Sequence, residues 1–163
     1  MIRLLAVDID GTLLDSKGRL PDVHREALEE AVGAGVDIAL VTGRSFHFAR
    51  PVASLLPIPL TLIVNNGALV KRTDGTTEVR HLLPRAIARQ ILSGTRAYED
   101  SVALVFDRQP DSRGSMPDER QIVFERMDWS HPHRRGWQSD YESDLVSDLV
   151  SDLVSDLVSD SNR

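Results

Sequence analysis

Two carboxylates one residue apart, Asp8 and Asp10, directly follow an apolar run that begins at Leu4. Gly11 and Thr12 come next, so the two acids stand at a turn. Acids held this close repel one another unless a cation lies between them or one of them is protonated. Mg²⁺ prefers oxygen ligands of this kind and is commonly bound together with phosphate groups. These residue types at this spacing therefore predict a catalytic metal and phosphate site.

The apolar run before Asp8 is expected to form a buried strand of a parallel sheet. In open α/β sheets, ligands collect outside the carboxyl ends of the strands, which is where Asp8 and Asp10 would lie. The following elements are a helix with Asp22 as its N-cap, a strand over 36–41, a helix over 45–56 that bends or restarts at Pro51, and a strand over 60–64. This β-α-β-α-β order is typical of a parallel sheet with right-handed crossovers.

Small polar residues follow the second and the third predicted strands as well. Thr42-Gly43-Arg44 ends the second strand, and Asn65-Asn66-Gly67-Ala68 ends the third. Either segment alone would be a plain turn. Because the carboxyl ends of parallel strands lie at one edge of a sheet, we expect these turns to lie near the acid pair.

The segment Asp8-x-Asp10-Gly11-Thr12 resembles motif I of the haloacid dehalogenase superfamily of phosphohydrolases. Thr42-Gly43-Arg44 resembles motif II, and Asn65 to Ala68 resembles a companion feature of the Cof-type branch. The resemblance covers roughly residues 1–140. It implies an α/β fold, here an incomplete Rossmann-like parallel sheet that is followed by the start of an α+β cap domain.

The resemblance also implies a role for each matching residue. Asp8 would be the nucleophile that forms an aspartyl-phosphate, and Asp10 would be the general acid and base. Mg²⁺ would bind the Asp8 carboxylate and the Asp10 backbone carbonyl. Arg44 either contacts the substrate or caps the sheet, and the sequence leaves both open. The residues expected to hold the substrate phosphate are Gly11, Thr12, Thr42, Gly43, Arg44, Asn66 and Gly67.

Two other metal sites are less favoured by the residues. An EF-hand loop that begins at Asp8 would need Glu at its twelfth position, where the chain has Arg19. His131-Pro132-His133 could form a metal pair, but Pro132 and two neighbouring arginines favour a surface loop.

The remaining catalytic motifs of the family are missing from the chain. Motif III is a cation, usually Lys, yet the only lysines are Lys17 and Lys71, and neither follows a cap-sized insert. The acidic motif IV has a literal match at 143–148, which recurs every four residues because the segment is repetitive. Without the strands that carry these motifs, the first strand would become an apolar sheet edge that favours self-association.

Three segments are expected: a core over 1–82, a partial cap over 83–142 and a tail over 143–163. A hairpin is expected over 70–82 with its turn at 73–75. The predicted cap then contains a helix over 84–98 and strands over 102–106 and 121–125. In the tail, Ser-Asp-Leu-Val repeats four times from Ser143, which favours disorder over a weak helix. An exact repeat of this kind also fits replication slippage or a reading-frame error.

Composition limits the partners. The net charge of −6 lies wholly in residues 140–163, because residues 1–139 hold 18 acidic and 18 basic groups. We therefore expect no nucleic-acid or membrane partner and a cytoplasmic location. The sequence predicts a Mg²⁺-dependent phosphohydrolase of small phosphorylated metabolites. An inactive fragment that binds phosphate or Mg²⁺ or self-associates is the alternative, and a phosphomutase-type transferase is a third possibility.

Overall fold

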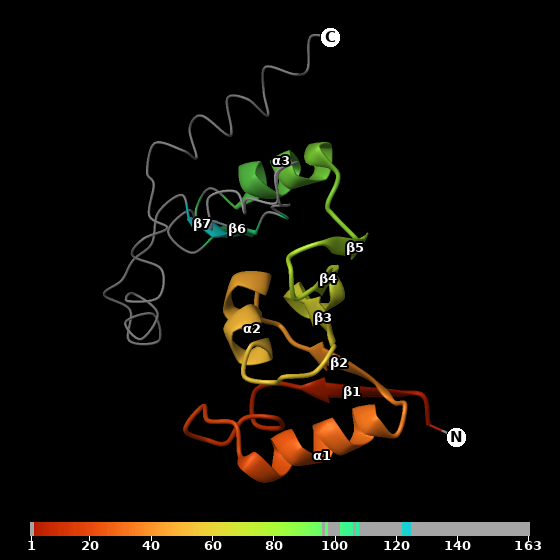
Figure 1. Ribbon diagram of the computed structural model, residues 1–163. Coiled ribbons are helices and arrows are strands. Elements are labelled where there is room, and N and C mark those ends of the chain that lie inside the picture. Colours follow the sequence, from red (N-terminus) through yellow and green to blue (C-terminus); the bar gives the residue numbers. More distant parts are fainter. Residues whose placement is uncertain (1, 96, 98–101, 106, 108–121, 125–163) are drawn as a thin grey trace. The chain divides into compact units, whose positions relative to one another are not determined.

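The computed structural model describes residues 2–95, 97, 102–105, 107 and 122–124 (Figure 1). Three helices and seven strands follow one another along this part of the chain in the order that the apolar runs predict. They are β1 (Leu4–Asp8), α1 (Asp22–Gly33), β2 (Asp37–Val41), α2 (Phe46–Ala53), β3 (Thr61–Val64), the 3₁₀ turn η1 (Asn65–Gly67), β4 (Leu69–Arg72), β5 (Thr77–Arg80), α3 (Arg85–Gly94), β6 (Ala103–Val105) and β7 (Ile122–Phe124).

The chain divides into two compact units. Among the described residues, the first unit holds residues 2–82 together with Asp107, and the second holds those of 83–105 and strand β7. The second unit contains α3 and the antiparallel pair of β6 and β7. All of the predicted site residues belong to the first unit.

The first unit is built on a five-stranded sheet of order β1-β2-β3-β4-β5. Strands β1, β2 and β3 are parallel, whereas β4 and β5 form an antiparallel hairpin beside β3. Asp8 pairs with Val41, and Val41 pairs with Ile63, so the last residues of the three parallel strands stand on one rung. The turns that follow these strands therefore begin at the same edge of the sheet, as predicted.

One face of this sheet carries the core. Side chains two residues apart along β2 and β3, such as Ile38 and Leu40, pack with Leu28 of α1 and with the apolar face of α2. Burial of these side chains is the main stabilising term of the unit. The most deeply buried apolar members, each under 3% exposed, are Ile9, Leu13, Leu40, Phe46, Ala49, Ala53, Leu62, Val64 and Leu69.

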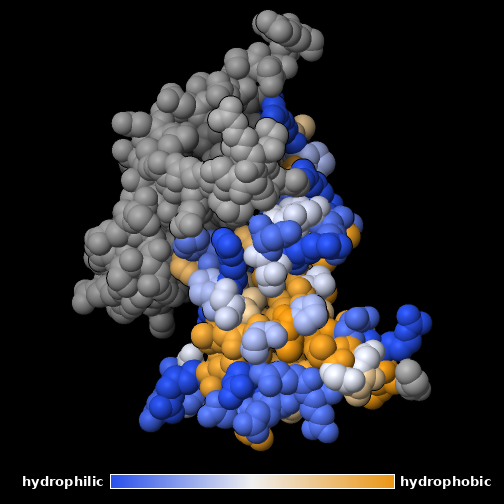
Figure 2. Space-filling view, in the orientation of Figure 1, coloured by the Kyte–Doolittle hydropathy of each residue, from blue (hydrophilic) through white to orange (hydrophobic). Residues whose placement is uncertain are grey.

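Strand β1 lies at an edge of the sheet, as predicted, and it is poorly covered. Among the described strands only β2 pairs with it. Leu4 is 57% exposed and Leu5 39% exposed, and Ile2 just before them is 74% exposed. Figure 2 shows an apolar area over the strands, beside the hydrophilic surface of α1.

One local prediction about the helices was wrong, and one of two alternatives for a second helix does not occur. Asp22 is the first residue of α1 rather than its N-cap, which is Pro21, and the Asp22 carboxylate instead accepts a hydrogen bond from Arg25 at 2.9 Å. Proline is well suited to a helix start because its fixed φ is pre-organised there and it lacks an N–H that would need a partner. Helix α2 runs through Pro51 to Ala53 without restarting.

The last predicted helix is also shorter than expected, since α3 ends at Gly94 and Thr95 is its C-cap. The tail over 143–163, the His131-Pro132-His133 segment and the literal motif IV match lie outside the described residues. Among the described helices, none has the length and apolar character needed to cross a membrane.

Candidate active site

Asp8 is the last residue of β1, and Asp10 lies in the turn that follows it. Between them, Ile9 is fully buried in the core, so it anchors the turn while both acids are exposed. The turn is closed by the Leu13 N–H, which donates to the Asp8 carbonyl at 3.0 Å. Gly11 has a φ of 77°, a conformation that glycine adopts without a steric penalty. The positive φ at this position explains why a glycine follows the two acids.

The turn after β2 is tied to the turn after β3 by backbone hydrogen bonds. The Asn66 N–H donates to the Thr42 carbonyl at 3.2 Å, and the Asn65 N–H donates to the Arg44 carbonyl at 2.9 Å. Thr42 is buried, and its hydroxyl oxygen accepts a hydrogen bond from the Arg44 N–H at 3.1 Å. Thr42, Arg44 and Asn66 thus form one connected wall of the site.

Gly43 is needed in this wall because of the residue opposite. A Cβ atom at position 43 would lie 2.9 Å from the Asn66 side-chain oxygen, which is closer than such atoms approach in proteins. Asn65 and Asn66 have φ values of 52° and 54°, and Gly67 has 90°. Left-handed backbone at non-glycine residues is costly and is concentrated at functional sites. This geometry gives the Asn-Asn-Gly sequence a physical basis.

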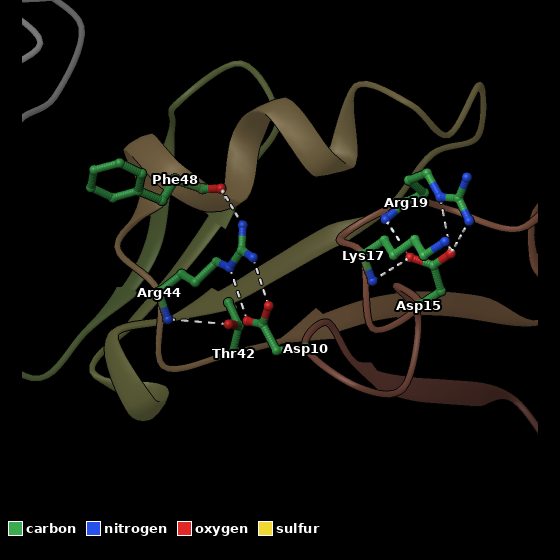
Figure 3. A network of polar contacts seen from close by, with 7 residues as sticks. All are labelled: Asp10, Asp15, Lys17, Arg19, Thr42, Arg44 and Phe48. Atoms are coloured by element: carbon green, nitrogen blue, oxygen red, sulfur yellow. Dashed lines mark hydrogen bonds and ion pairs between the residues drawn. The ribbon is translucent and has the colours of Figure 1, made fainter. Parts of the chain in front are cut away.

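Arg44 forms a two-pronged ion pair with Asp10 (Figure 3). Its Nε donates to Asp10 Oδ2 at 2.9 Å, and its Nη2 donates to Asp10 Oδ1 at 2.6 Å. The hydrogen bond from Arg44 holds the pKa of the Asp10 carboxyl below its ordinary value, and the same contact raises the pKa of Arg44. Sequence reasoning missed this pair, and the only signal for it was a basic residue placed beside the acid turn.

The Asp8 carboxylate makes no side-chain hydrogen bond or ion pair with the described part of the chain. The Asp8 and Ile9 carbonyls accept turn hydrogen bonds, whereas the Asp10 carbonyl accepts none from the described residues. A carboxylate and a carbonyl oxygen on one exposed turn fit a hard cation such as Mg²⁺, which usually keeps several waters. No group of three or more His, Cys, Asp or Glu side chains able to hold a metal occurs in the described ranges.

Neither lysine of the chain belongs to this wall. Lys17 lies in the exposed turn around Asp15, where its N–H donates to Asp15 Oδ1 at 2.8 Å. Lys71 is fully buried in β4, and its Nζ donates to Thr77 Oγ1 at 2.8 Å and to Asp107 Oδ1 at 2.6 Å. Among the described residues, Arg44 is therefore the cation that contacts the acid turn.

A comparison of the chain with profiles of known families identifies the class of protein to which this sheet and its three strand-end turns belong. The family profile of the haloacid dehalogenase-like hydrolases matches residues 5–145. The chain belongs to this family, which confirms the resemblance and the Rossmann-like α/β fold that it implied.

Individual relatives agree with this assignment. The chain is 35% identical over 82 residues to the 5-amino-6-(5-phospho-D-ribitylamino)uracil phosphatase YcsE of Bacillus subtilis, which covers 50% of the chain and 33% of that protein. It is 38% identical over 81 residues to a phosphoglycolate phosphatase of Methanothermobacter thermautotrophicus, covering 50% and 35%. The chain thus matches about a third of the length of these curated relatives.

Solved structures share the architecture. A haloacid dehalogenase-like hydrolase from B. subtilis superimposes with a TM-score of 0.57 at 30% identity, covering 64% of the chain and 36% of that structure. The crystal structure of TM0651 from Thermotoga maritima gives a TM-score of 0.67 and covers 96% of the chain and 54% of that structure. Its identity of 18% makes it evidence for the fold alone.

Proposed function

We propose that the acid turn is the centre of a phosphohydrolase that acts on phosphate monoesters of small metabolites. The observation that carries the proposal is the difference between the two acids. The Asp8 carboxylate has no hydrogen-bond or ion-pair partner among the described residues, whereas both Asp10 carboxylate oxygens accept hydrogen bonds from Arg44. One carboxylate is thereby open to a substrate or a cation, and the other has a fixed direction. Two acids in different environments suit two chemical roles.

In the first step, an Asp8 carboxylate oxygen attacks phosphorus, and the bond from phosphorus to the ester oxygen breaks. Asp10 gives a proton to the departing alkoxide, and an aspartyl-phosphate remains on Asp8. Asp10 needs a proton for this step, although Arg44 lowers its pKa. A phosphate dianion that arrives beside Asp10 favours protonation, because a nearby negative charge raises the pKa of a carboxyl.

In the second step, Asp10 removes a proton from water, and the water oxygen attacks phosphorus. The bond from phosphorus to Asp8 then breaks, which releases inorganic phosphate and restores both acids. Asp10 is held as a carboxylate by Arg44, the form that can accept a proton. The Thr42 hydroxyl and the backbone of the Asn65–Gly67 turn would contact the phosphoryl oxygens.

Asp8 and the Asp10 carbonyl would hold Mg²⁺, which when bound offsets the charge of the phosphate and of Asp8. The relatives support the substrate class, since the phosphatases named above act on a phosphorylated ribitylaminouracil and on phosphoglycolate according to their names. Both names describe small phosphorylated metabolites.

The test is hydrolysis of an aryl phosphate with and without Mg²⁺ by the full chain and by Asp8→Asn. We expect turnover that requires Mg²⁺ and falls to background in Asp8→Asn. Asp22→Asn is the matched control, because Asp22 is exposed on α1 and its carboxylate contacts only Arg25 among the described residues. A folded chain without Mg²⁺-dependent turnover would refute the proposal and favour an inactive phosphate- or Mg²⁺-binding module.

The exposed edge of β1 supports a second role, self-association. Among the described strands, none pairs with the side of β1 that faces away from β2, and Leu4 on this strand is exposed. Unpaired edge strands favour pairing with a strand of another chain, here a second copy. Light scattering should show mass rising with concentration, and Leu4→Lys should suppress the rise. Val23→Lys, at a position 66% exposed on α1, is the control that should not. A stable monomer at all concentrations would overturn this role.

A further inference from the structure

Arg44 makes contacts beyond its ion pair with Asp10. Through Asp10 it contacts the turn after β1, and its carbonyl accepts from the Asn65 N–H in the turn after β3. Its own N–H donates to the Thr42 hydroxyl oxygen, and its Nη1 donates to the Phe48 carbonyl of α2 at 3.4 Å. Arg44 is thus bonded to all three strand-end turns and to the helix beside them.

We propose that Arg44 is a positioning residue, which fixes the directions of the Asp10 carboxylate and of the Thr42 hydroxyl toward the reacting phosphate. This inference rests on the proposed phosphohydrolase activity. In this role Arg44 acts through Asp10, a third possibility beside the substrate contact and the sheet cap that the sequence leaves open.

The fork geometry explains why the position requires arginine. The planar guanidinium presents two parallel N–H groups that match both carboxylate oxygens, so it fixes the rotation of the carboxylate as well as its place. A lysine ammonium is a point charge that would attract the carboxylate without setting its rotation. Proton transfer needs the acid within hydrogen-bond reach of the departing oxygen, so a rotated carboxylate would be a poorer catalyst.

The Thr42 contact has a related consequence. A hydroxyl oxygen that accepts from the Arg44 N–H keeps its own proton for another acceptor, here a phosphoryl oxygen. This bond comes from the backbone, so it survives a change of the Arg44 side chain. A side-chain variant therefore separates the effect on Asp10 from the effect on Thr42.

The pair contributes little to stability, which makes a clean test possible. Its side chains are 32% exposed for Arg44 and 59% exposed for Asp10. Ion pairs this exposed typically contribute about 0–1 kcal/mol. The chain also offers a control, because Arg19 forms an exposed ion pair with Asp15 in a turn that carries no candidate catalytic residue (Figure 3). There the Arg19 Nε and Nη2 both donate to Asp15 Oδ2, at 3.1 and 2.9 Å.

The experiment compares kcat, KM and the melting temperature of the full chain with those of Arg44→Gln, Arg44→Lys and Arg19→Gln. We expect Arg44→Gln to lower kcat between about tenfold and a hundredfold, because a misplaced catalytic group costs up to this factor. KM should change less than about threefold, and the melting temperature no more than in Arg19→Gln, since the pair is exposed. Arg44→Lys should recover little of kcat.

Each other outcome overturns the inference. A rise in KM at constant kcat would make Arg44 a substrate-binding residue, and full activity in Arg44→Lys would show that charge alone suffices. An unchanged kcat in Arg44→Gln, with an active wild-type chain, refutes the positioning role and leaves the proposed function intact. A wild-type chain without Mg²⁺-dependent turnover refutes the proposed function itself, and the positioning role with it.

Discussion

The buried ion pair between Lys71 and Asp107 gives a prediction with a defined magnitude. The Lys71 side chain is fully buried, that of Asp107 is 1% exposed, and their charged atoms lie 2.6 Å apart. Asp107 also contacts Arg80 at 3.2 Å, and Thr77 donates to it at 3.0 Å. The Lys71 ammonium lies 5.0 Å from the centre of the Phe46 ring. The pair therefore links β4 to α2 and to the point where the chain re-enters the first unit.

Removing one partner should be far more harmful than removing both. Lys71→Met leaves a buried carboxylate without its main partner, a change that typically costs about 3–5 kcal/mol. We expect about 3 kcal/mol, the lower end, because Arg80 still contacts the Asp107 carboxylate. The double variant Lys71→Met with Asp107→Leu should lie within about 1 kcal/mol of the wild type, since an apolar pair of similar volume replaces both charges.

Urea denaturation followed by far-ultraviolet circular dichroism measures these free energies of unfolding. A loss of about 3 kcal/mol is a large part of the 5–15 kcal/mol that is typical of a small protein. Arg72→Met is the matched control on the same strand, because Arg72 pairs with Glu78 at an exposed position and should cost under about 1 kcal/mol. Equal losses for Lys71→Met and Arg72→Met would refute the reasoning.

Three further predictions concern the site. Gly43→Ala should displace the Asn66 side chain, because the new Cβ would lie 2.9 Å from its oxygen. We expect a clear loss of kcat in activity assays and only a small loss of unfolding free energy in urea curves. Carbon-detected NMR of the metal-free chain should give Asp10 a pKa below its ordinary value, and this pKa should rise in Arg44→Gln. Because the folded-state pKa of Asp10 is lowered, the stabilisation by the ion pair is present above the unfolded-state pKa. It is lost as the pH falls through the folded-state pKa. Ser45→Ala should not destabilise the chain in thermal melts, because the buried Ser45 hydroxyl has no hydrogen-bond partner among the described residues and makes no capping hydrogen bond to α2, whereas losing a helix cap typically costs about 1 kcal/mol.

The sheet and the place of the acid turn could be predicted because they depend on local patterns. Apolar runs that end in polar turns predict parallel strands, and the structure puts Asp8 on the same rung as Val41. The place of the turn at Gly11 could be predicted in the same way, because glycine adopts the positive φ found there without a steric penalty. Each strand and each turn depends on residues that are close in sequence, and the parallel order of the strands follows from the β-α-β-α-β succession.

Contacts between residues that are distant in the sequence could not be predicted. Arg44 and Asp10 are separated by two elements, and the sequence contains many other pairs of opposite charge that could have met. Lys71 belongs to a short strand whose alternation gave no sign that a charged side chain would face the core, or that Asp107 would reach it. The prediction that Asp22 is the N-cap of α1 was wrong for a local reason, because the Asp22 carboxylate accepts a hydrogen bond from Arg25, one turn further along the helix.

The most direct test of the central claim is to find the phosphate on Asp8. The full chain is mixed with an aryl phosphate and Mg²⁺, quenched in acid and reduced with borohydride, which converts a phosphorylated aspartate to homoserine. Cleavage after Arg3 and Lys17 gives one peptide that contains Asp8, Asp10 and Asp15, so two of the three acids are internal controls. Mass spectrometry should place the change at position 8 alone. An unmodified peptide under turnover, or a change at Asp10, would contradict the account.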